Sequence, residues 1–308
     1  MKRSAKILVT GASGFIGREV TRRLCRRGYE VHAVARSPGI IEDAIWHPVD
    51  LFDMSAVNGL LEEVRPSHLI HFAWVTEPGR FWNSPENHRW ERATQDLFDS
   101  FANRGGKRFI GAGSCAEYEW TGKPCLETAA GGIPATLYGQ AKLATFSWVE
   151  ARALQCGVSS AWGRIFWLYG PHEHRQRLIP HVITGVLQRR PVDCSSGEQL
   201  RDFLHVDDVA EAFVRLLESD VKGAVNIASG NAVPVKEIIS RIAQCLGGQQ
   251  LIRFGAIPSN SSEPLVVCGD VSRLKEEVGF IPEISLATGL ESTISWWKQQ
   301  PGIKAVSV

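Results

Sequence analysis

The chain has 308 residues, with 34 Lys and Arg against 33 Asp and Glu, so its formal net charge is only +1. This balance gives no electrostatic reason to expect nucleic acid or an anionic membrane as the main partner. No apolar run approaches the roughly 20 residues that span a bilayer, and the N-terminus has no signal-peptide core. We therefore expect a globular, cytoplasmic protein. Seven scattered cysteines without a CxxC pair favour buried thiols over disulfides or a zinc site, and we expect no bound metal.

Apolar strands alternate with helices along the first half of the chain. The predicted order is a strand at 5–10, a helix ending at 27, strands at 29–35 and 45–50, a helix at 55–64, a strand at 67–73, a helix from the late 80s to 102, a strand at 107–113, a helix at 134–154 and a strand at 159–167. Such alternation indicates βαβ units and a parallel sheet covered by helices on both faces. The fold class is therefore α/β, with a doubly wound parallel sheet.

After Pro171 the pattern changes to shorter elements. Helices are predicted near 178–188, 206–218 and 234–246, strand-like pieces at 224–228 and 250–254, and a last helix at 290–298. We expect residues 1–171 to form the sheet domain and 172–308 to form mainly a smaller, mixed α/β substrate-binding lobe. Segments near 190–228 are expected to return to the first domain, adding strands and a helix.

Three glycines separate the first predicted strand from the first helix. Gly11, Gly14 and Gly17 lie in the segment GASGFIG. A turn this tight needs residues without Cβ, so that backbone N–H groups and the helix N-terminus can approach a pyrophosphate. The pattern predicts a dinucleotide-binding Rossmann domain. Ser13, Phe15 and Ile16 belong to the same cradle.

The residues after the second strand indicate which dinucleotide binds. An NAD-binding chain has a carboxylate there to accept hydrogen bonds from the ribose, but this stretch reads Val34-Ala35-Arg36-Ser37. Arg36 can instead pair with a 2′-phosphate through charge-assisted hydrogen bonds. NADP is therefore favoured, and NAD is left open. Asp50 and Leu51, after the third strand, are placed to meet the adenine edge.

A phenol and an ammonium group lie one helical turn apart in the predicted helix 134–154. Tyr138 and Lys142 are at positions i and i+4, so they share one face. We expect the ammonium to lower the pKa of Tyr138 from its usual value of about 10. Ser114 ends the strand at 107–113 and can hydrogen-bond a substrate carbonyl or hydroxyl. These three are the candidate catalytic residues.

Together with the glycine loop, this trio resembles the extended short-chain dehydrogenase/reductase family, in its nucleotide-sugar epimerase/dehydratase branch. The matching segments are HLIHFA (68–73), GSCAEY (113–118), LYGP (168–171), RDFLHVDDVA (201–210) and NIASG (226–230). The resemblance also implies a homodimer, in which helices at about 88–104 and 138–156 of two copies pair.

The resemblance implies a role for each site residue. Tyr138 would be the general acid–base, Lys142 would bind the nicotinamide ribose and tune Tyr138, and Ser114 would orient the reacting oxygen. Phe72 and Ala73 would lie on the nicotinamide side. The chemistry would be hydride transfer at a carbinol carbon, with proton transfer at its oxygen.

The residues after Ser114 discriminate between activities within the branch. Members that eliminate water have an Asp-Glu pair there, whereas this chain has Cys115 and Ala116. Fucose synthases have a Cys two residues after the Ser and a His in the following loop, where this chain has Ala116 and Arg177. We therefore predict an NADPH-dependent reductase of a nucleoside-diphosphate 4-keto-6-deoxy sugar. The alternative is a nucleotide-sugar 4-epimerase with tightly held NAD(P).

The substrate end of the resemblance departs from the family pattern. Trp167 and Trp90 replace two asparagines, and the position of a second phosphate-binding arginine falls at Ser259. These departures leave open a reductase of an apolar or aromatic ketone. The expected substrate-binding residues are Trp74, Cys115, Trp167, Arg177 and Arg201, with Arg201 placed to meet a phosphate.

Ten tryptophans against four tyrosines are an unusual surplus. Five of them follow strand ends or lie in segments expected near the nicotinamide and the substrate: Trp74, Trp82, Trp90, Trp120 and Trp167. The other five fall inside predicted strands and helices and are expected to be structural: Trp46, Trp148, Trp162, Trp296 and Trp297. His71, in the fourth strand, is expected to be a core residue.

Overall fold

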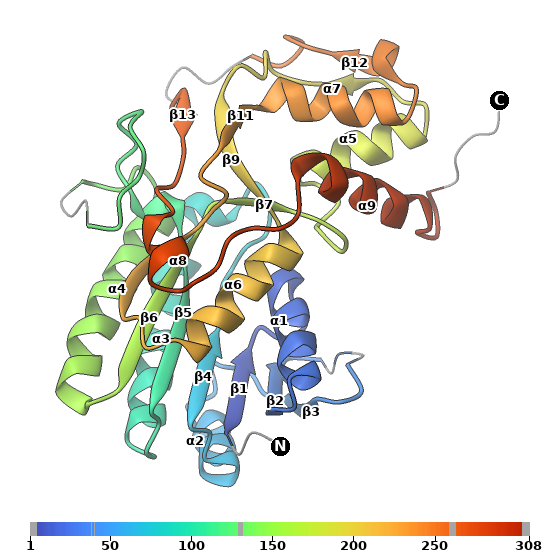
Figure 1. The fold of residues 1–308 in the computed structure, drawn as a ribbon. Helices are drawn as coiled ribbons and strands as arrows, with labels where there is room; N and C mark the ends of the chain where they lie inside the picture. Colours follow the sequence, from blue (N-terminus) through green and yellow to red (C-terminus); the bar gives the residue numbers. More distant parts are fainter. Residues whose placement is uncertain (1–4, 38, 40, 129–131, 259–262, 304–308) are drawn as a thin grey trace.

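A parallel seven-stranded sheet forms the centre of the larger part of the molecule (Figure 1). The computed structural model describes residues 5–37, 39, 41–128, 132–258 and 263–303. The strand order is β10-β6-β5-β4-β1-β2-β3, and every neighbouring pair is parallel. The strands are β1 (Lys6–Thr10), β2 (Glu30–Ala35), β3 (Ile45–Pro48), β4 (His68–His71), β5 (Arg108–Ser114), β6 (Ser159–Ile165) and β10 (Gly223–Ile227).

Helices cover both faces of this sheet. One layer contains α1 (Phe15–Arg26) and α6 (Val206–Glu218), and the other contains α2 (Met54–Val64), α3 (Glu86–Ala102) and α4 (Leu137–Cys156). Successive residues of β1 point to opposite faces. Ile7 and Val9 accordingly join the core beneath α1 and α6, whereas Leu8 joins the core beneath α2, α3 and α4. The predicted doubly wound parallel sheet is confirmed.

A smaller lobe lies at the carboxyl end of the sheet (Figure 1). Its helices α5 (Leu178–Leu187), α7 (Val235–Cys245) and α9 (Leu286–Lys298) share a separate apolar core. Its strands are β7 (Trp167–Tyr169), β8 (Val192–Asp193), β9 (Leu200–His205), β11 (Ala232–Pro234), β12 (Ile252–Arg253) and β13 (Val266–Val267). The remaining elements are α8 (Ser272–Glu276) and the 3-10 turns η1 (Phe81–Asn83), η2 (Cys115–Glu117) and η3 (Gln249–Leu251). This is the predicted mixed α/β lobe.

The predicted strand at 159–167 is wrong at its end. The large sheet keeps β6 only to Ile165, and Trp167–Tyr169 form β7, which pairs with β9 of the lobe. Apolar residues run without interruption across the break, so the pattern could not show where the chain changes sheets. β9 itself was not predicted, although it is the central strand of the lobe sheet.

Two helix boundaries also differ from the predictions, for local reasons. α4 begins at Leu137 rather than 134, because the Thr136 hydroxyl caps it by accepting the N–H of Gly139. α9 begins four residues before the predicted start, because the Ser285 hydroxyl accepts the N–H of Thr288. The strand predicted at 250–254 is reduced to β12.

Segments from the second half of the chain divide between the two parts. β10 pairs with β6 in the large sheet and α6 packs on α1, whereas β8 and β9 lie in the lobe sheets. We propose Pro171 as the limit between the two parts, with β7 before it paired into the lobe sheet and α6 and β10 after it returning to the first part.

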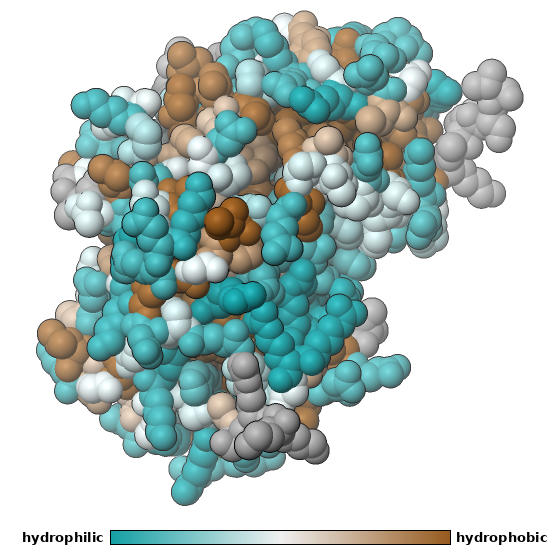
Figure 2. Space-filling model, viewed as in Figure 1, coloured by the Kyte–Doolittle hydropathy of each residue, from teal (hydrophilic) through white to brown (hydrophobic). Residues whose placement is uncertain are grey.

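Hydrophilic side chains cover most of the face shown in Figure 2, with hydrophobic side chains in smaller groups between them. Among the described residues, no helix is both long enough and apolar enough to cross a membrane.

Candidate functional site

A cavity of about 1300 Å³ opens beyond the carboxyl ends of the sheet strands. β1 and β4 are neighbours at its floor, and the chain winds outward in opposite directions from them, an arrangement that places ligands at this edge of α/β sheets. Every candidate site residue predicted from the sequence lines this cavity. They are Gly11, Ser13, Gly14, Phe15, Ile16, Gly17, Arg36, Asp50, Leu51, Phe72, Ala73, Trp74, Ser114, Cys115, Tyr138, Lys142, Trp167, Arg177 and Arg201.

The turn between β1 and α1 has no room for side chains at two of its glycines. Gly11 has a φ of +66°, and a Cβ there would lie 2.8 Å from the backbone nitrogen of Ala73. A Cβ on Gly17 would collide with the carbonyl oxygen of Gly11. No side chain among the described residues caps α1 at Gly14, so the N–H groups of its first turn remain available for an anion. This cradle fits the pyrophosphate of a dinucleotide.

Arg36 extends from the end of β2 along the wall of the same cavity. Its side chain is exposed and has no hydrogen-bond or ion-pair partner among the described residues. Asp50 lines the wall beside it, and its carboxylate accepts the N–H of Phe52 at 3.0 Å. Arg36 is therefore a positive charge at the cavity wall that no described carboxylate offsets.

A buried ion pair holds the end of β5, where Ser114 lies. The Ser114 N–H donates to Glu117 Oε1 at 2.8 Å, and Arg164 Nε donates to Glu117 Oε2 at 2.7 Å. Trp162 Nε1 donates to the same Oε1 at 2.9 Å. The Glu117 side chain is completely buried. We did not predict Glu117 from the sequence, although Ser114 followed by Glu three residues later is a capping-box pattern.

Tyr138 and Lys142 are both buried on α4, and they do not interact as predicted. Lys142 Nζ donates to the carbonyl oxygen of Ala112 at 2.8 Å and lies 6.0 Å from the centre of the Tyr138 ring. Burial raises the pKa of Tyr138, although a hydrogen bond with Ser114 opposes the increase. The expectation that Lys142 lowers this pKa is wrong, because desolvation of the phenolate is the larger effect. The phenol therefore keeps its proton at neutral pH.

The Lys142 ammonium lies against an aromatic face. Its Nζ is 3.7 Å from the centre of the Trp74 ring, a cation–π contact. Trp74 is itself fixed, because its Nε1 donates to Asn87 Oδ1 at 2.8 Å and Asn87 Nδ2 donates to the carbonyl oxygen of Phe81 at 2.7 Å. Burial lowers the pKa of Lys142 to about 7, and the Glu117 carboxylate partly opposes that decrease.

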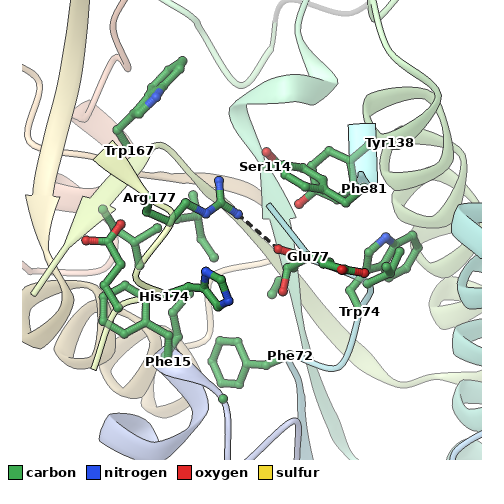
Figure 3. Close-up of a pocket in the computed structure, with 18 of the residues that line it drawn as sticks. Phe15, Phe72, Trp74, Glu77, Phe81, Ser114, Tyr138, Trp167, His174 and Arg177 are labelled. Carbon is green, nitrogen blue, oxygen red and sulfur yellow. Dashed lines mark hydrogen bonds between the residues drawn. The ribbon is translucent and has the colours of Figure 1, made fainter. Parts of the chain in front are cut away.

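Four of the five tryptophans expected at the site line the cavity, namely Trp74, Trp82, Trp90 and Trp167. Trp82 and Phe81 meet the Tyr138 ring edge-on, at 5.8 and 4.9 Å between ring centres. Phe81 and Tyr138 lie together at one side of the cavity in Figure 3. Trp120 does not line the cavity itself: its Nε1 donates to the carbonyl oxygen of Cys115, and it packs against the apolar cluster that contains Trp74 and Tyr138. The result is an aromatic wall around the candidate proton donor.

Two arginines face the part of the cavity nearest the lobe. Arg177 points into the cavity between His174 and the Ser114–Tyr138 pair, and its Nη2 donates to the carbonyl oxygen of Thr76 at 3.3 Å (Figure 3). Arg201 is buried beside Trp167, and its Nη2 donates to Glu263 Oε1 at 2.6 Å. The charge of Arg201 is thus already paired. Ser259, the position expected for a second phosphate-binding arginine, lies outside the described residues.

Two further predictions concern buried side chains near the site. His71 is a core residue as expected, with hydrogen bonds to Thr10 at 2.7 Å and Thr94 at 2.9 Å. Burial lowers the pKa of His71 to about 3, so the imidazole is neutral. Burial raises the pKa of the Cys115 thiol. Within the described part of the chain, no group of three or more His, Cys, Asp and Glu side chains is placed to hold a metal ion.

Comparisons with known proteins place these features in context. A model of the NAD dependent epimerase/dehydratase family matches residues 7–228. The chain is 25% identical over 320 residues to a UDP-glucose 4-epimerase of Rhizobium leguminosarum bv. trifolii, covering 94% of this chain and 96% of that protein. It is 26% identical over 323 residues to GDP-L-fucose synthase 1 of Arabidopsis thaliana, covering 96% and 94%. The solved structure of MoeE5 in complex with UDP-glucose and NAD is 28% identical, with a TM-score of 0.83 over 96% of this chain and 99% of that chain.

Proposed function

The chain belongs to the NAD dependent epimerase/dehydratase family, and on that premise we propose that it uses NADPH to reduce the keto group of a nucleoside-diphosphate 4-keto-6-deoxy sugar. The substrate class is supported by relatives that are nucleotide-sugar enzymes, among them a UDP-glucose 4-epimerase and a GDP-L-fucose synthase.

The protonation state of Tyr138 is the observation that favours reduction of a ketone over oxidation of an alcohol. Its phenol is buried next to Ser114 and keeps its proton, since burial raises its pKa. Reduction of a ketone requires an acid that protonates the carbonyl oxygen as the carbon is reduced. A protonated Tyr138 is ready for that step, whereas oxidation of an alcohol would require the phenolate first.

The residues of the site divide the reaction between them. A nicotinamide cofactor bound over the glycine cradle would supply a hydride to the carbonyl carbon. Ser114 holds the carbonyl oxygen through its hydroxyl, and Tyr138 transfers its phenolic proton to that oxygen. The Lys142 ammonium stabilises the phenolate that remains. Glu117 keeps Ser114 in place through the backbone N–H.

Arg36 supports NADP as the cofactor. It is a charge without an ion-pair partner among the described residues, at the cavity wall after β2. A guanidinium group there can bind a 2′-phosphate with two parallel hydrogen bonds. NAD remains the alternative, since MoeE5 was solved with NAD.

The substrate would lie between the catalytic trio and the lobe. Arg177 and Arg201 line that part of the cavity and suit a diphosphate, with Arg201 sharing its guanidinium group between the phosphate and Glu263. Trp74 and Trp167 offer flat apolar faces to a sugar or a base. Cys115 and Ala116 supply no acid–base pair after Ser114, so we do not propose dehydration.

Two other functions remain as alternatives with distinct outcomes. A nucleotide-sugar 4-epimerase would keep its NAD(P) bound and form product without net consumption of NADPH. A reductase of an apolar or aromatic ketone is favoured by the aromatic wall of Phe81, Trp82 and Trp90, and it would consume NADPH without any nucleotide sugar.

The variant Tyr138→Phe tests the proposal. It should abolish NADPH-dependent reduction and leave NADPH binding unchanged, because only the phenolic hydroxyl, the proton donor, is removed. Stopped-flow absorbance would measure turnover, and fluorescence titration would measure binding. Turnover retained by the variant would contradict the role of Tyr138.

We also propose that the protein is a homodimer, in which α3 and α4 of two copies pair. The two helices pack side by side within one copy. Light scattering on the purified protein tests this: a monomer at micromolar concentration would contradict it.

A further inference from the structure

Glu173 has one buried carboxyl oxygen without a hydrogen-bond partner among the described residues. It lies in the loop between β7 and α5 and lines the same cavity. Its Oε2 is buried and has no hydrogen-bond partner among the described residues. Its backbone N–H only closes a local turn by donating to Gly170 at 3.4 Å. The loop is therefore formed without help from this side chain.

A carboxyl group held in this way destabilises the ligand-free fold. Buried polar groups are almost always hydrogen-bonded, and leaving such a bond unmade costs folding free energy. Glu117 shows the ordinary solution in the same chain, with three donors on its two oxygens. Burial raises the pKa of Glu173 to about 8, against the opposing effect of Arg177. Folding alone gives no reason for a carboxyl here.

The position of Glu173 indicates what the carboxyl faces. Glu173 lines the same cavity as Ser114 and Tyr138, and Arg177, four residues further along the loop, lines it too. The loop that carries His174 and Arg177 lies across the cavity from Ser114 and Tyr138 (Figure 3). A ligand that reaches the catalytic trio passes beside this loop.

We propose that Glu173 binds a hydroxyl group of the bound ligand through Oε2 and thereby selects ligands that carry hydroxyl groups. A carboxylate accepts a hydrogen bond from a hydroxyl, and a neutral carboxyl group can donate one as well. A site built to bind a hydroxyl rejects an analogue that lacks it, because the buried carboxyl is then left unpaired. The hydroxyl group can come from the substrate sugar or from a ribose of the cofactor. The inference rests on the proposed function only in the first case.

Glu173→Met tests this, because methionine has a similar length and no polar group. Three quantities are compared with the unchanged protein: the unfolding temperature without ligand, the Kd for NADPH, and the Kd for UDP-, GDP- and dTDP-glucose. We expect a higher unfolding temperature and a loss of about tenfold or more in one affinity. A loss confined to the nucleotide sugars assigns the hydroxyl to the substrate, and a loss confined to NADPH assigns it to the cofactor. Glu291→Met, an exposed position on α9, is the matched control and should change none of the three.

Two results would overturn the inference. A lower unfolding temperature in Glu173→Met would show that the carboxyl stabilises the fold, and unchanged affinities for every ligand would show that it binds none of them. If no nucleotide sugar binds the unchanged protein, the proposed substrate class fails. The NADPH measurement and the unfolding temperature then still decide the role of Glu173.

Discussion

Lys142 has a buried amino group at the wall of the cavity. The residue is 3% exposed, its Nζ donates to the carbonyl oxygen of Ala112, and the nearest aromatic ring is that of Trp74 at 3.7 Å. Burial therefore lowers its pKa from 10.5 to about 7. A lysine with a pKa near 7 can gain or lose its proton when a ligand binds. This suits Lys142, which would have to stabilise the Tyr138 phenolate during only part of the reaction.

The Lys142→Met variant should be more stable than the unchanged protein, by an amount that depends on pH, because it no longer buries an amino group. The amino group of Lys142 has a pKa of 10.5 in the unfolded chain and about 7 in the folded chain. Between these values the unfolded chain binds the proton more tightly, so the free energy of unfolding decreases as the pH falls from 10.5 to 7. Without ligand, the variant should unfold at a higher temperature than the unchanged protein at pH 7, and the difference should shrink as the pH rises. Lys123→Met, at an exposed position, is the control. A difference that grows with pH would contradict the assignment.

Arg36→Ala should weaken NADPH binding by about tenfold or more, since one charge-assisted contact to the 2′-phosphate is lost. NADH has no such phosphate and serves as the internal control. Fluorescence titration of both cofactors measures the difference. An equal loss for NADPH and NADH would show that Arg36 does not discriminate between them.

At the scale of elements, the turn from β1 to α1 is what shapes the cofactor cradle. Gly17 packs against the Gly11 carbonyl so tightly that the two backbones leave no room for a Cβ. Gly11 in turn lies against the backbone of Ala73, two residues beyond the end of β4. Binding of the pyrophosphate thus depends on backbone spacing and not on a side chain.

Gly17→Ala should remove cofactor binding, because the new methyl group must push α1 away from Gly11. Gly59→Ala makes the same change in the middle of α2, where no atom lies within contact distance. That control should gain up to about 1 kcal/mol in stability from helix propensity. Calorimetric titration with NADPH, together with thermal unfolding, compares the two. Normal binding by a folded Gly17→Ala protein would refute this account of the cradle.

The elements that the sequence predicted well are those whose signal is local. Strand, glycines and helix at the N-terminus follow one another within 26 residues, and Tyr138 and Lys142 lie one helical turn apart. β9 was missed because its charged residues do not resemble a buried strand. Asp202 is nevertheless fully buried, and its carboxylate accepts the N–H groups of Ser229, Gly230 and Gly269.

The missed site residues depend on contacts between distant segments. Asn87 holds Trp74 from another element, and Glu117 meets Arg164 of β6. Glu173 is distinctive only because no partner reaches its Oε2, which no sequence pattern can show. Spacing thus predicted the cofactor cradle and the catalytic trio, whereas the environment of each group required the structure.

At the scale of the whole molecule, the sheet domain and the lobe have separate apolar cores, and the cavity is lined by residues of both. The sheet supplies the cradle and the catalytic trio, and the lobe supplies Arg201 and most of the loop side chains. A ligand that contacts both parts would bind only the folded arrangement and so stabilise it in proportion to its concentration. Saturating NADPH should therefore raise the unfolding temperature.

The proposed reduction is tested most directly by comparing the amount of NADPH consumed with the amount of sugar product formed. The purified protein is incubated with NADPH and a nucleoside-diphosphate 4-keto-6-deoxy sugar, and both NADPH absorbance and the sugar product are followed over time. We predict that NADPH is consumed in equal amount to the deoxy sugar formed, and that Tyr138→Phe stops both. A keto sugar left unreduced, together with conversion of UDP-glucose into its 4-epimer without loss of NADPH in a parallel incubation, would contradict the account and establish the epimerase instead.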